Sequence, residues 1–392
     1  MDTIAGSSNR DEALGRMSRW FRFNVWLHRW SSLIATPFFF VLCVTGTILI
    51  FHHEIEDLLG TLPEVTVPAG ATRAPLAPML EEAHARAAER KAMYVFWDPD
   101  EPERVAIGMG PQGATKFDEV HPSFFNAYTG EYLKSIDFSK TLSGFMLTLH
   151  ANWFLDLPGQ LFGGVIALLV VLSLLSGLVV YAPYVKRIAF GVVRGRPGSR
   201  LKQLDLHNLI GVVVLGWAFI VSLTGVFLAL ASIAIQVWAN TELKEMVAKT
   251  PPATEAVAAP RPSIDAIVAT AQEALPHREL RFITFPGTEL SGDRHYTALL
   301  YGRSGYDDKL FEIVMIEAAT GRITDIRPAP WYLKLIMLSE PLHFGDYGGL
   351  PLQLLWFACT WLTMYIVGNG AWLWWTRRST RRRSTAMAGA QA

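Results

Sequence analysis

The stretch Leu27-His28-Arg29-Trp30 begins a long apolar segment that ends near Thr45-Gly46, and this pattern decides the fold. The pattern returns later as Leu206-His207 and Thr224-Gly225. The shift is the same for both parts, because 207 − 28 and 224 − 45 each give 179. We infer two related membrane-length helices, each with a histidine at one end and a small-residue pair near the other.

A second set of residues repeats in the same way, at a shift of 193. Its members are Leu149-His150, Pro158 and Gly177 in the first copy, and Leu342-His343, Pro351 and Gly370 in the second. The chain therefore holds two copies of a two-helix unit, with one histidine near the N-terminal end of every helix. The recurring glycines leave room for close helix approach or for a flat macrocycle. They are Gly46, Gly177, Gly225 and Gly370.

The composition favours a membrane protein. Hydrophobic residues make up 51% of the 392 residues, aromatic residues 12%, and the mean hydropathy is +0.25, all high for a water-soluble protein. The net charge is zero, so no overall field attracts nucleic acid, and we expect no nucleic-acid partner. Cys43 and Cys359 lie inside apolar runs, which argues against a disulfide framework.

Four segments have the roughly 20 apolar residues needed to cross a bilayer, at 26–51, 161–182, 208–232 and 352–375. Basic residues cluster before the first segment, between the second and third, and after the fourth, so these three regions are expected in the cytoplasm. Both termini are then cytoplasmic in a multi-pass protein of a bacterial inner membrane. The two long loops lie in the periplasm.

Each long loop has the pattern of a small helix followed by an antiparallel sheet. Helices are predicted at 76–91 and 264–275, and strands at 92–97, 104–108, 117–136, 279–285, 295–301 and 309–316. A turn with Thr129-Gly130 recurs as Thr320-Gly321, at a shift of 191. So small a sheet is marginal alone, and we expect the two domains to pack on each other or on the bundle.

The predicted fold class is a membrane α-helical bundle of four transmembrane helices in two pseudo-symmetric halves, with two small periplasmic α+β domains. The predicted parts are a cytoplasmic tail 1–15, helix one 16–51, loop domain one 52–141, an elbow with helix two 142–182, a basic cytoplasmic loop 183–206, helix three with its extension 207–249, loop domain two 250–330, an elbow with helix four 331–376, and a basic cytoplasmic tail 377–392.

Depth sorts four histidines into two layers. His28 and His207 open helices on the cytoplasmic side, whereas His150 and His343 precede helices on the periplasmic side. Two imidazoles facing each other across an axis are what a six-coordinate haem iron needs. The alternatives are a purely structural role at helix ends and a zinc site. Zinc fits poorly, because it prefers three or four clustered ligands.

Further side chains are candidates for the same site. His52 and His53 are alternative periplasmic ligands without a counterpart in the second repeat. Arg22, Arg29 and Lys202 lie near the cytoplasmic pair and could hold haem propionates, although they also serve as topology signals. The substrate-side candidates are Trp153, Trp331, Tyr332 and Tyr347, which could equally be bilayer anchors.

The four helices, the paired histidines and the doubled loop domains with their Thr-Gly turns resemble the PepSY-associated transmembrane family over roughly residues 16–380. Within it, the chain is similar to inner-membrane ferric-siderophore reductases of the FoxB type. The resemblance implies PepSY-like loop domains and two haem b groups per chain. His28 and His207 would bind one haem, and His150 and His343 the other.

The implied function is the transfer of electrons from the cytoplasmic side to a ferric siderophore in the periplasm. Some relatives carry a fused flavin-reductase portion, and we expect none in this chain. The implied donor is therefore a separate protein, a soluble cofactor or a quinol. Two other functions stay open, a non-enzymatic envelope regulator acting through the loop domains, and a permease for iron or a siderophore.

Overall fold

The computed structural model describes residues 18–67, 69–117, 119–185, 189–196, 199–249 and 261–389. The predicted tail 1–15 lies outside these residues, as does the beginning of the predicted second loop domain. The chain divides into two compact units. The helical unit comprises Met1–Phe51, Met146–Ala229 and Leu342–Ala392, and the sheet unit comprises His52–Phe145 and Leu230–Pro341.

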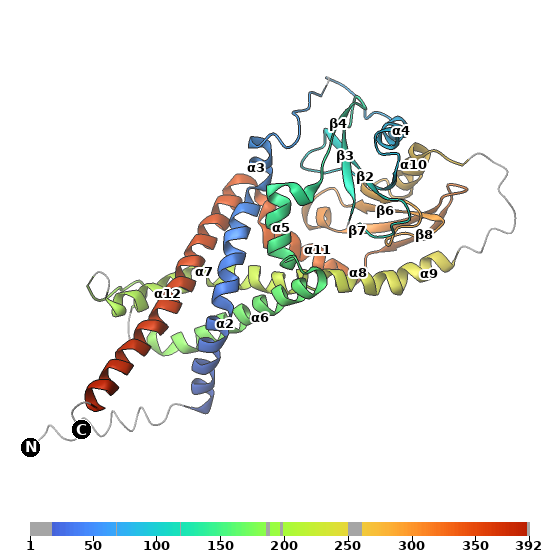
Figure 1. Ribbon diagram of the computed structural model, residues 1–392. Coiled ribbons are helices and arrows are strands. Elements are labelled where there is room, and N and C mark those ends of the chain that lie inside the picture. The colour runs from blue at the N-terminus through green and yellow to red at the C-terminus, as the bar shows by residue number, and fades with distance from the viewer. Residues whose placement is uncertain are drawn as a thin grey trace, which may run out of the picture. The chain divides into compact units, whose positions relative to one another are not determined.

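Within the described residues, four helices are long and apolar enough to cross a membrane, which confirms the four predicted spans. They form a ring in which α2 and α7 each contact both α6 and α12 (Figure 1). The helices that contribute to this unit are α2 (Arg19–Ile50), α5 (Leu142–Asn152), α6 (Asp156–Val185), α7 (Arg200–Leu228), α11 (Trp331–Phe344), the short η3 (Asp346–Gly348) and α12 (Gly349–Gly389).

Helices α2 and α7 begin earlier than the hydropathy pattern predicts, because a serine caps each of them. The hydroxyl of Ser18 accepts a hydrogen bond from the backbone N–H of Phe21 at 3.2 Å. The hydroxyl of Ser199 does the same for Lys202 at 3.2 Å. Such a cap satisfies a backbone donor that the first helical turn leaves free, so the helix extends beyond its apolar stretch.

The connections that lead into α6 and α12 both use left-handed backbone conformations. In the second connection they fall on Gly345 and Gly349, with φ of +74° and +59°. In the first they fall on Trp153, Phe154 and Asp156, with φ between +49° and +59°. The left-handed conformation destabilises a residue with a Cβ atom by roughly 1 kcal/mol. The first connection is therefore strained, whereas the second has glycine at these positions and is not.

One antiparallel sheet of eight strands forms the core of the sheet unit, in the order β4-β3-β2-β1-β5-β6-β7-β8. The first loop supplies β1 (Arg90–Phe96), β2 (Arg104–Pro111), β3 (His121–Asn126) and β4 (Tyr132–Ser135), and the second supplies β5 (Glu279–Thr284), β6 (His295–Tyr301), β7 (Phe311–Glu317) and β8 (Ile323–Pro328). The two sets meet at β1 and β5, where Val95 lies opposite Ile283. The loops predicted as two small domains therefore share one sheet.

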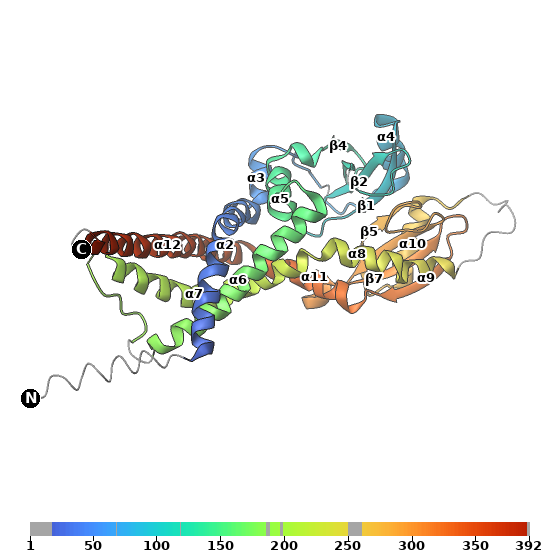
Figure 2. The ribbon, with the colours of Figure 1, turned by 60° about the horizontal axis from the view of Figure 1, so that its bottom comes forward.

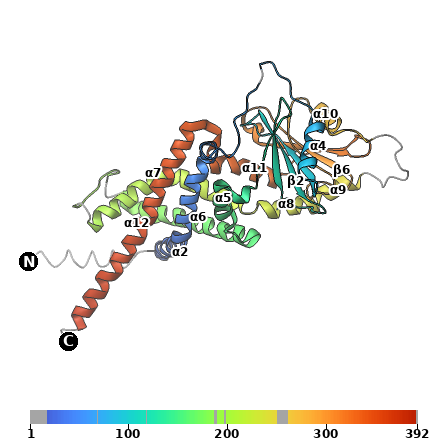
Figure 3. The same ribbon diagram turned by 45° about the horizontal axis from the view of Figure 1, so that its top comes forward.

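Helices cover both faces of this sheet. Helices α4 (Leu76–Arg86) and α10 (Ile264–Ala274) lie side by side on one face, as Figure 3 shows, and close a single core with strands from both loops. On the other face, α8 and α9 run beside β7 (Figure 2). There Trp238 of α8 and Met246 of α9 pack on Ile313 and Met315 of β7. The remaining elements are α3 (His52–Leu58), η1 (Phe138–Lys140), α8 (Ala231–Asn240), α9 (Glu242–Ala248) and η2 (Gly305–Lys309).

The structure differs from the predicted elements at three points of the sheet unit. The helix predicted at 76–91 ends at Arg86, because β1 already begins at Arg90. The stretch 117–136, predicted as one strand region with a turn at 126–131, forms two separate strands, β3 and β4; the predicted turn is confirmed at Gly130, with φ of +76°. Strand β8 was not predicted. It is an edge strand on which Ile323 and Ile326 are exposed, so it lacks the alternation of a half-buried strand.

An aspartate from the second loop caps a helix of the first, and its removal should destabilise the sheet unit. Asp265 accepts hydrogen bonds from the backbone N–H groups of Leu76 and Ala77 at 2.6 and 3.0 Å, whereas the N-cap residue Pro75 forms none through its side chain. We expect Asp265→Ala to lower the free energy of unfolding by about 1 kcal/mol in a denaturant titration. The exposed Glu273 on the same helix provides the control Glu273→Ala, and equal losses would contradict this role.

Candidate histidine pairs of the helical unit

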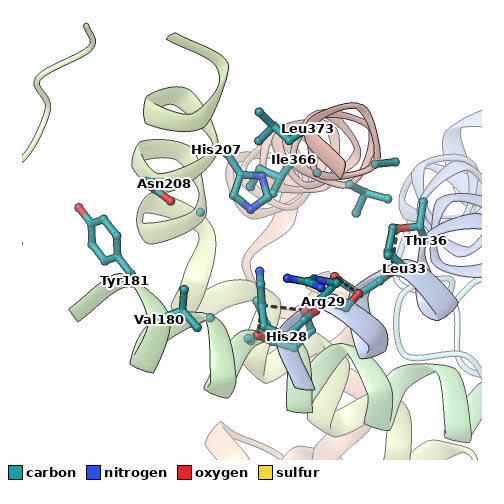
Figure 4. Close-up of a pocket in the computed structure, with 18 of the residues that line it drawn as sticks. His28, Arg29, Leu33, Thr36, Val180, Tyr181, His207, Asn208, Ile366 and Leu373 are labelled. Carbon is teal, nitrogen blue, oxygen red and sulfur yellow. Dashed lines mark hydrogen bonds between the residues drawn. The ribbon is translucent and has the colours of Figure 1, made fainter. Parts of the chain in front are cut away.

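The four repeated histidines form two pairs inside the helical unit. His28 of α2 and His207 of α7, called the first pair, have ring centroids 6.5 Å apart with the ring planes at 72°. His150 of α5 and His343 of α11, the second pair, have centroids 6.2 Å apart at 69°. Figure 4 shows a ring nitrogen of His28 and one of His207 pointing toward each other across an open space. The structure thus brings together the residues that the sequence sorts by depth.

The two pairs lie at two levels that helix geometry sets. Gly46 follows His28 by 18 residues on α2, and Gly225 follows His207 by 18 residues on α7. Eighteen residues are five turns, so each histidine and its distant glycine share one face of the helix, roughly 27 Å apart along the axis. The rings of the second pair lie against these glycines, so both halves of the chain build the same two levels.

Each recurring glycine makes space for one imidazole ring. A Cβ atom at Gly177 would lie 3.0 Å from two ring atoms of His28. The corresponding distances are 3.3 Å from Gly46 to His150, 3.2 Å from Gly225 to His343 and 3.3 Å from Gly370 to His207. The sequence offered close helix approach or room for a macrocycle as reasons for these glycines. The structure gives a more specific one, because a side chain here would displace the ring.

The missing Cβ lets each ring reach the carbonyl group four residues before the glycine. Nδ1 of His28 lies 2.9 Å from the carbonyl oxygen of Ser173, and Nδ1 of His343 lies 2.9 Å from that of Val221. The carbonyl groups of Leu42 and Ile366, four residues before Gly46 and Gly370, lie near the other two rings, and Nδ1 of His207 has no hydrogen-bond partner among the described residues.

These contacts assign the tautomer of the rings. A carbonyl oxygen only accepts hydrogen bonds, so the hydrogen atom of a neutral imidazole sits on Nδ1 where the two meet. Nε2 then keeps its lone pair, which is the form of histidine that binds a metal ion. The helical unit therefore holds imidazoles in the tautomer that ligates through Nε2.

A cavity of about 800 Å³ surrounds the first pair, within the usual size of ligand sites (Figure 4). Its lining is mostly apolar, but Arg29, Arg200 and Arg377 from three helices also line it. Among the described residues, none of the three forms a salt bridge and each is exposed. An apolar space with unpaired cations fits a flat apolar ligand that carries acidic groups at one end.

The structure divides the predicted propionate candidates. Arg29 lines the cavity, whereas Arg22 and Lys202 do not appear among the described residues that line it. Arg200 and Arg377, which also line the cavity, were not among the predicted candidates. Arg200 precedes His207 by seven residues and Arg377 follows Gly370 by seven, so each lies two turns away on roughly the same helix face. That spacing is the signal that could have identified them.

Each pair offers a metal ion two nitrogen ligands and little else. Within the described part of the chain, no group of three or more His, Cys, Asp or Glu side chains could hold a metal ion. A tetrahedral zinc site needs such a group. A metal that already has four equatorial ligands needs only two more, one from either side, and haem iron is of this kind. The donor set therefore fits haem better than a bare ion.

The alternative ligands His52 and His53 lie on α3 of the sheet unit, with ring centroids 4.0 Å apart. Nδ1 of His53 lies 3.7 Å from a carboxylate oxygen of Glu101. The interaction with the Glu101 carboxylate raises the pKa of His53, and His53 in turn helps to lower the pKa of Glu101 to about 2. A protonated imidazole has no lone pair for iron, so this ion pair competes with metal binding.

The predicted substrate-side aromatic residues are divided between the two units. Trp153 of the helical unit packs between Phe38 and Phe162, with centroids 5.9 and 5.4 Å away. Tyr347 of the same unit faces a tryptophan ring, whereas Trp331 and Tyr332 belong to the sheet unit. Trp331 is 76% exposed, and its neighbour bonds to Glu242.

Comparison with known proteins assigns the class. Residues 25–377 match the family described as the PepSY-associated TM region, so the chain belongs to this family and the predicted resemblance is confirmed at that level. The matched range includes both histidine pairs. The chain is also 24% identical over 259 residues to the uncharacterized protein PA4219 of Pseudomonas aeruginosa PAO1. That alignment covers 60% of this chain and 64% of the relative, which is less than two thirds of its length.

A side chain at the glycine opposite His207 should displace this ring. Two glycines of α12 form a matched pair, because a Cβ at Gly370 would lie 3.3 Å from His207, whereas a Cβ at Gly368 would meet nothing within 4 Å. On the predicted ligation of haem by the first pair, we expect Gly370→Val to lose most of this haem and Gly368→Val to keep it, as measured by the haem absorption of the purified proteins. Equal haem contents would contradict the packing role of Gly370.

The ion pair of His53 should make the sheet unit more stable in weak acid than at alkaline pH. The ion pair stabilises the folded state fully below the ordinary pKa of histidine, near 6.5, and this stabilisation is lost as the pH rises through the raised pKa of His53. Glu101 stays ionised down to about pH 2. We expect His53→Gln to be less stable than the parent at pH 6 and equal to it at pH 9, in thermal unfolding. The control His84→Gln, at an exposed position of α4, should show no such difference.

Proposed function

We propose that the protein is a di-haem b-type oxidoreductase of a bacterial inner membrane, which carries electrons to ferric iron held by a siderophore in the periplasm. The geometry of the histidine pairs carries the proposal. With metal–nitrogen bonds of about 2.0 Å and a ring nitrogen about 1.1 Å from its ring centre, two imidazoles on one iron have centroids roughly 6 Å apart. The observed separations of 6.5 and 6.2 Å agree with this value.

Haem b, when bound, would supply reversible one-electron exchange. His28 and His207 would hold one group and His150 and His343 the other, each through Nε2. Arg29, Arg200 and Arg377 line the cavity of the first pair, where their charges suit the two carboxylates of a porphyrin. Helix α2 also packs through the apolar side chains of Ala35, Phe38 and Phe39 on α6, and this packing excludes water from that part of the bundle.

The orientation follows from basic residues near the helix ends. Arg19 and Arg22 open α2, Arg194 and Arg196 lie in the short connection before α7, and Arg377 lies in the last third of α12. Positive residues in short segments stay in the cytoplasm, so the first pair would lie on the cytoplasmic side and the second on the periplasmic side. In this arrangement the sheet unit is periplasmic.

We further propose that the sheet unit consists of two PepSY-like halves related by pseudo-symmetry. The strand order supports this relation, because β4-β3-β2-β1 and β5-β6-β7-β8 run outward from a common centre. A helix accompanies each half, α4 in the first and α10 in the second. A shared sheet of eight strands buries more apolar surface than two separate sheets of four.

The chemistry of siderophores makes them suitable acceptors. They bind ferric iron through hard oxygen donors, and the softer ferrous ion is held less tightly after reduction. One electron per iron is the full requirement, which two one-electron groups in series can deliver. A hydrocarbon core of about 30 Å is long for one electron hop, so two levels of histidines shorten each step. The donor would be a cytoplasmic protein, a soluble cofactor or a quinol.

Haem stoichiometry tests the proposal directly. We expect the detergent-purified protein to contain two haem b groups per chain in a pyridine haemochrome assay, with a low-spin bis-histidine spectrum. His150→Ala and His343→Ala should each reduce the content to one, whereas His52→Ala and His53→Ala should retain two. The reduced protein should then be reoxidised by a ferric hydroxamate siderophore in a stopped-flow experiment. Folded protein without haem would refute the proposal and favour a regulatory role for the sheet unit.

A further inference from the structure

We infer that Thr45 and Thr224 are positioning residues for the second histidine pair, and that their hydroxyl groups tune its two ligands. This inference rests on the proposed haem function. Both threonines immediately precede a glycine that faces a ring, so they belong to the repeated Thr-Gly pairs of α2 and α7. The glycine makes space for the ring, and the threonine supplies a hydrogen-bond partner for it.

Both hydroxyl groups contact Nδ1, the ring nitrogen that the proposed ligation through Nε2 would leave unused. Oγ1 of Thr45 lies 2.8 Å from Nδ1 of His150, and Oγ1 of Thr224 lies 3.2 Å from Nδ1 of His343. The two threonines are 2% and 5% exposed, so water does not compete for these bonds. A buried hydrogen bond to Nδ1 fixes the orientation of the imidazole ring.

The direction of these hydrogen bonds follows from the helices. The hydroxyl of Thr45 donates to the carbonyl oxygen of Val41 at 2.9 Å, and that of Thr224 donates to the carbonyl oxygen of Ile220 at 2.8 Å. Their hydrogen atoms are thus used within their own helices. The hydroxyl oxygens remain as acceptors, so Nδ1–H of each histidine donates to them. This agrees with the tautomer that the backbone carbonyl groups select.

The two threonines contribute unequally. Nδ1 of His343 also has the carbonyl oxygen of Val221 at 2.9 Å, which is closer than the hydroxyl of Thr224. For His150 the hydrogen bond of Nδ1 is the one with Thr45, at 2.8 Å. Removing the hydroxyl of Thr45 should therefore disturb its histidine more than removing that of Thr224.

The first pair has a different environment at the same positions. Ser176 precedes Gly177 and bonds to carbonyl groups of its own helix, at Leu172 and Ser173. Asn369 precedes Gly370 and donates to Gln203. Neither side chain bonds to a histidine of the first pair, although the hydroxyl of Ser173 lies 3.3 Å from Nδ1 of His28. The threonine partners are a property of the second pair.

The expected consequence is electronic as well as structural. An acceptor on Nδ1–H makes an imidazole a better electron donor to iron, which favours the ferric state. Thr45→Val keeps the side-chain shape and removes the acceptor. We expect it to raise the midpoint potential of the second haem and to weaken its binding about 10-fold, the usual lower limit for such partners. Thr224→Val should give a smaller shift in the same direction, and the first haem should not change.

The control variant, Thr47→Val, and the rescue variant, Thr45→Ser, both change residues of α2. Thr47→Val removes a hydroxyl that donates to Cys43 of α2, so this variant tests for a general effect of the substitution. Thr45→Ser retains the hydroxyl and should retain the parent potential. The measurements are a spectroelectrochemical titration of both haems and the haem content of each full-length variant in detergent.

Each outcome decides a separate question. Two haems in the parent with equal potentials in Thr45→Val and Thr47→Val would overturn this inference and leave the proposed function intact. A shift in Thr45→Ser as large as in Thr45→Val would also overturn it, because the hydroxyl would then be irrelevant. Absence of haem from the parent would overturn the proposed function and the inference with it. A shift confined to the second haem and reversed by serine would support both.

Discussion

The helical unit depends on one contact, the approach of an imidazole Nδ1 to the carbonyl group four residues before a glycine. A polar ring at membrane depth is costly unless it finds a partner, and helix backbones already use their polar groups internally. A carbonyl oxygen in a helix has a second lone pair, but the side chain one turn later normally covers it. A glycine at that position has no side chain, so the carbonyl oxygen is accessible to a ring. Thus Gly177 exposes Ser173 to His28, and Gly225 exposes Val221 to His343.

Repetition of this contact organises the bundle. On α2 and on α7 a histidine and a glycine are separated by five full turns, so each helix gives a ring to one level and receives a ring at the other. The helices α6 and α12 carry the complementary glycines, Gly177 and Gly370. A helix that rotated about its axis would lose both contacts together. The spacing therefore fixes both the rotation of the helix about its axis and its position along that axis. A single contact with a ring could not fix both.

The sequence was sufficient for the features that repeat and insufficient for those that depend on distant partners. Matched shifts identified the four helices and the four histidines without any contact information. The joining of two loops into one sheet was not visible, because the pairing of Val95 with Ile283 connects strands far apart in the chain. The cap that Asp265 provides for α4 is non-local for the same reason. Arg200 and Arg377 were not predicted to line the cavity, because basic residues at helix ends are already explained by the orientation of the helices in the membrane.

Duplication explains why two similar sites need not be identical. The glycine recurs at all four rings and the carbonyl hydrogen bond at two, whereas the residue before the glycine varies, as threonine in two cases and Ser176 and Asn369 in the others. The recurring part is required to seat a ring at all. The variable part decides only whether Nδ1 gains a further hydrogen-bond partner, as it does at Thr45 and Thr224, and it can change without loss of the fold. A repeat of this kind separates the placement of a ring from the hydrogen bonds of its Nδ1, and two levels with different hydrogen bonds follow from one architecture.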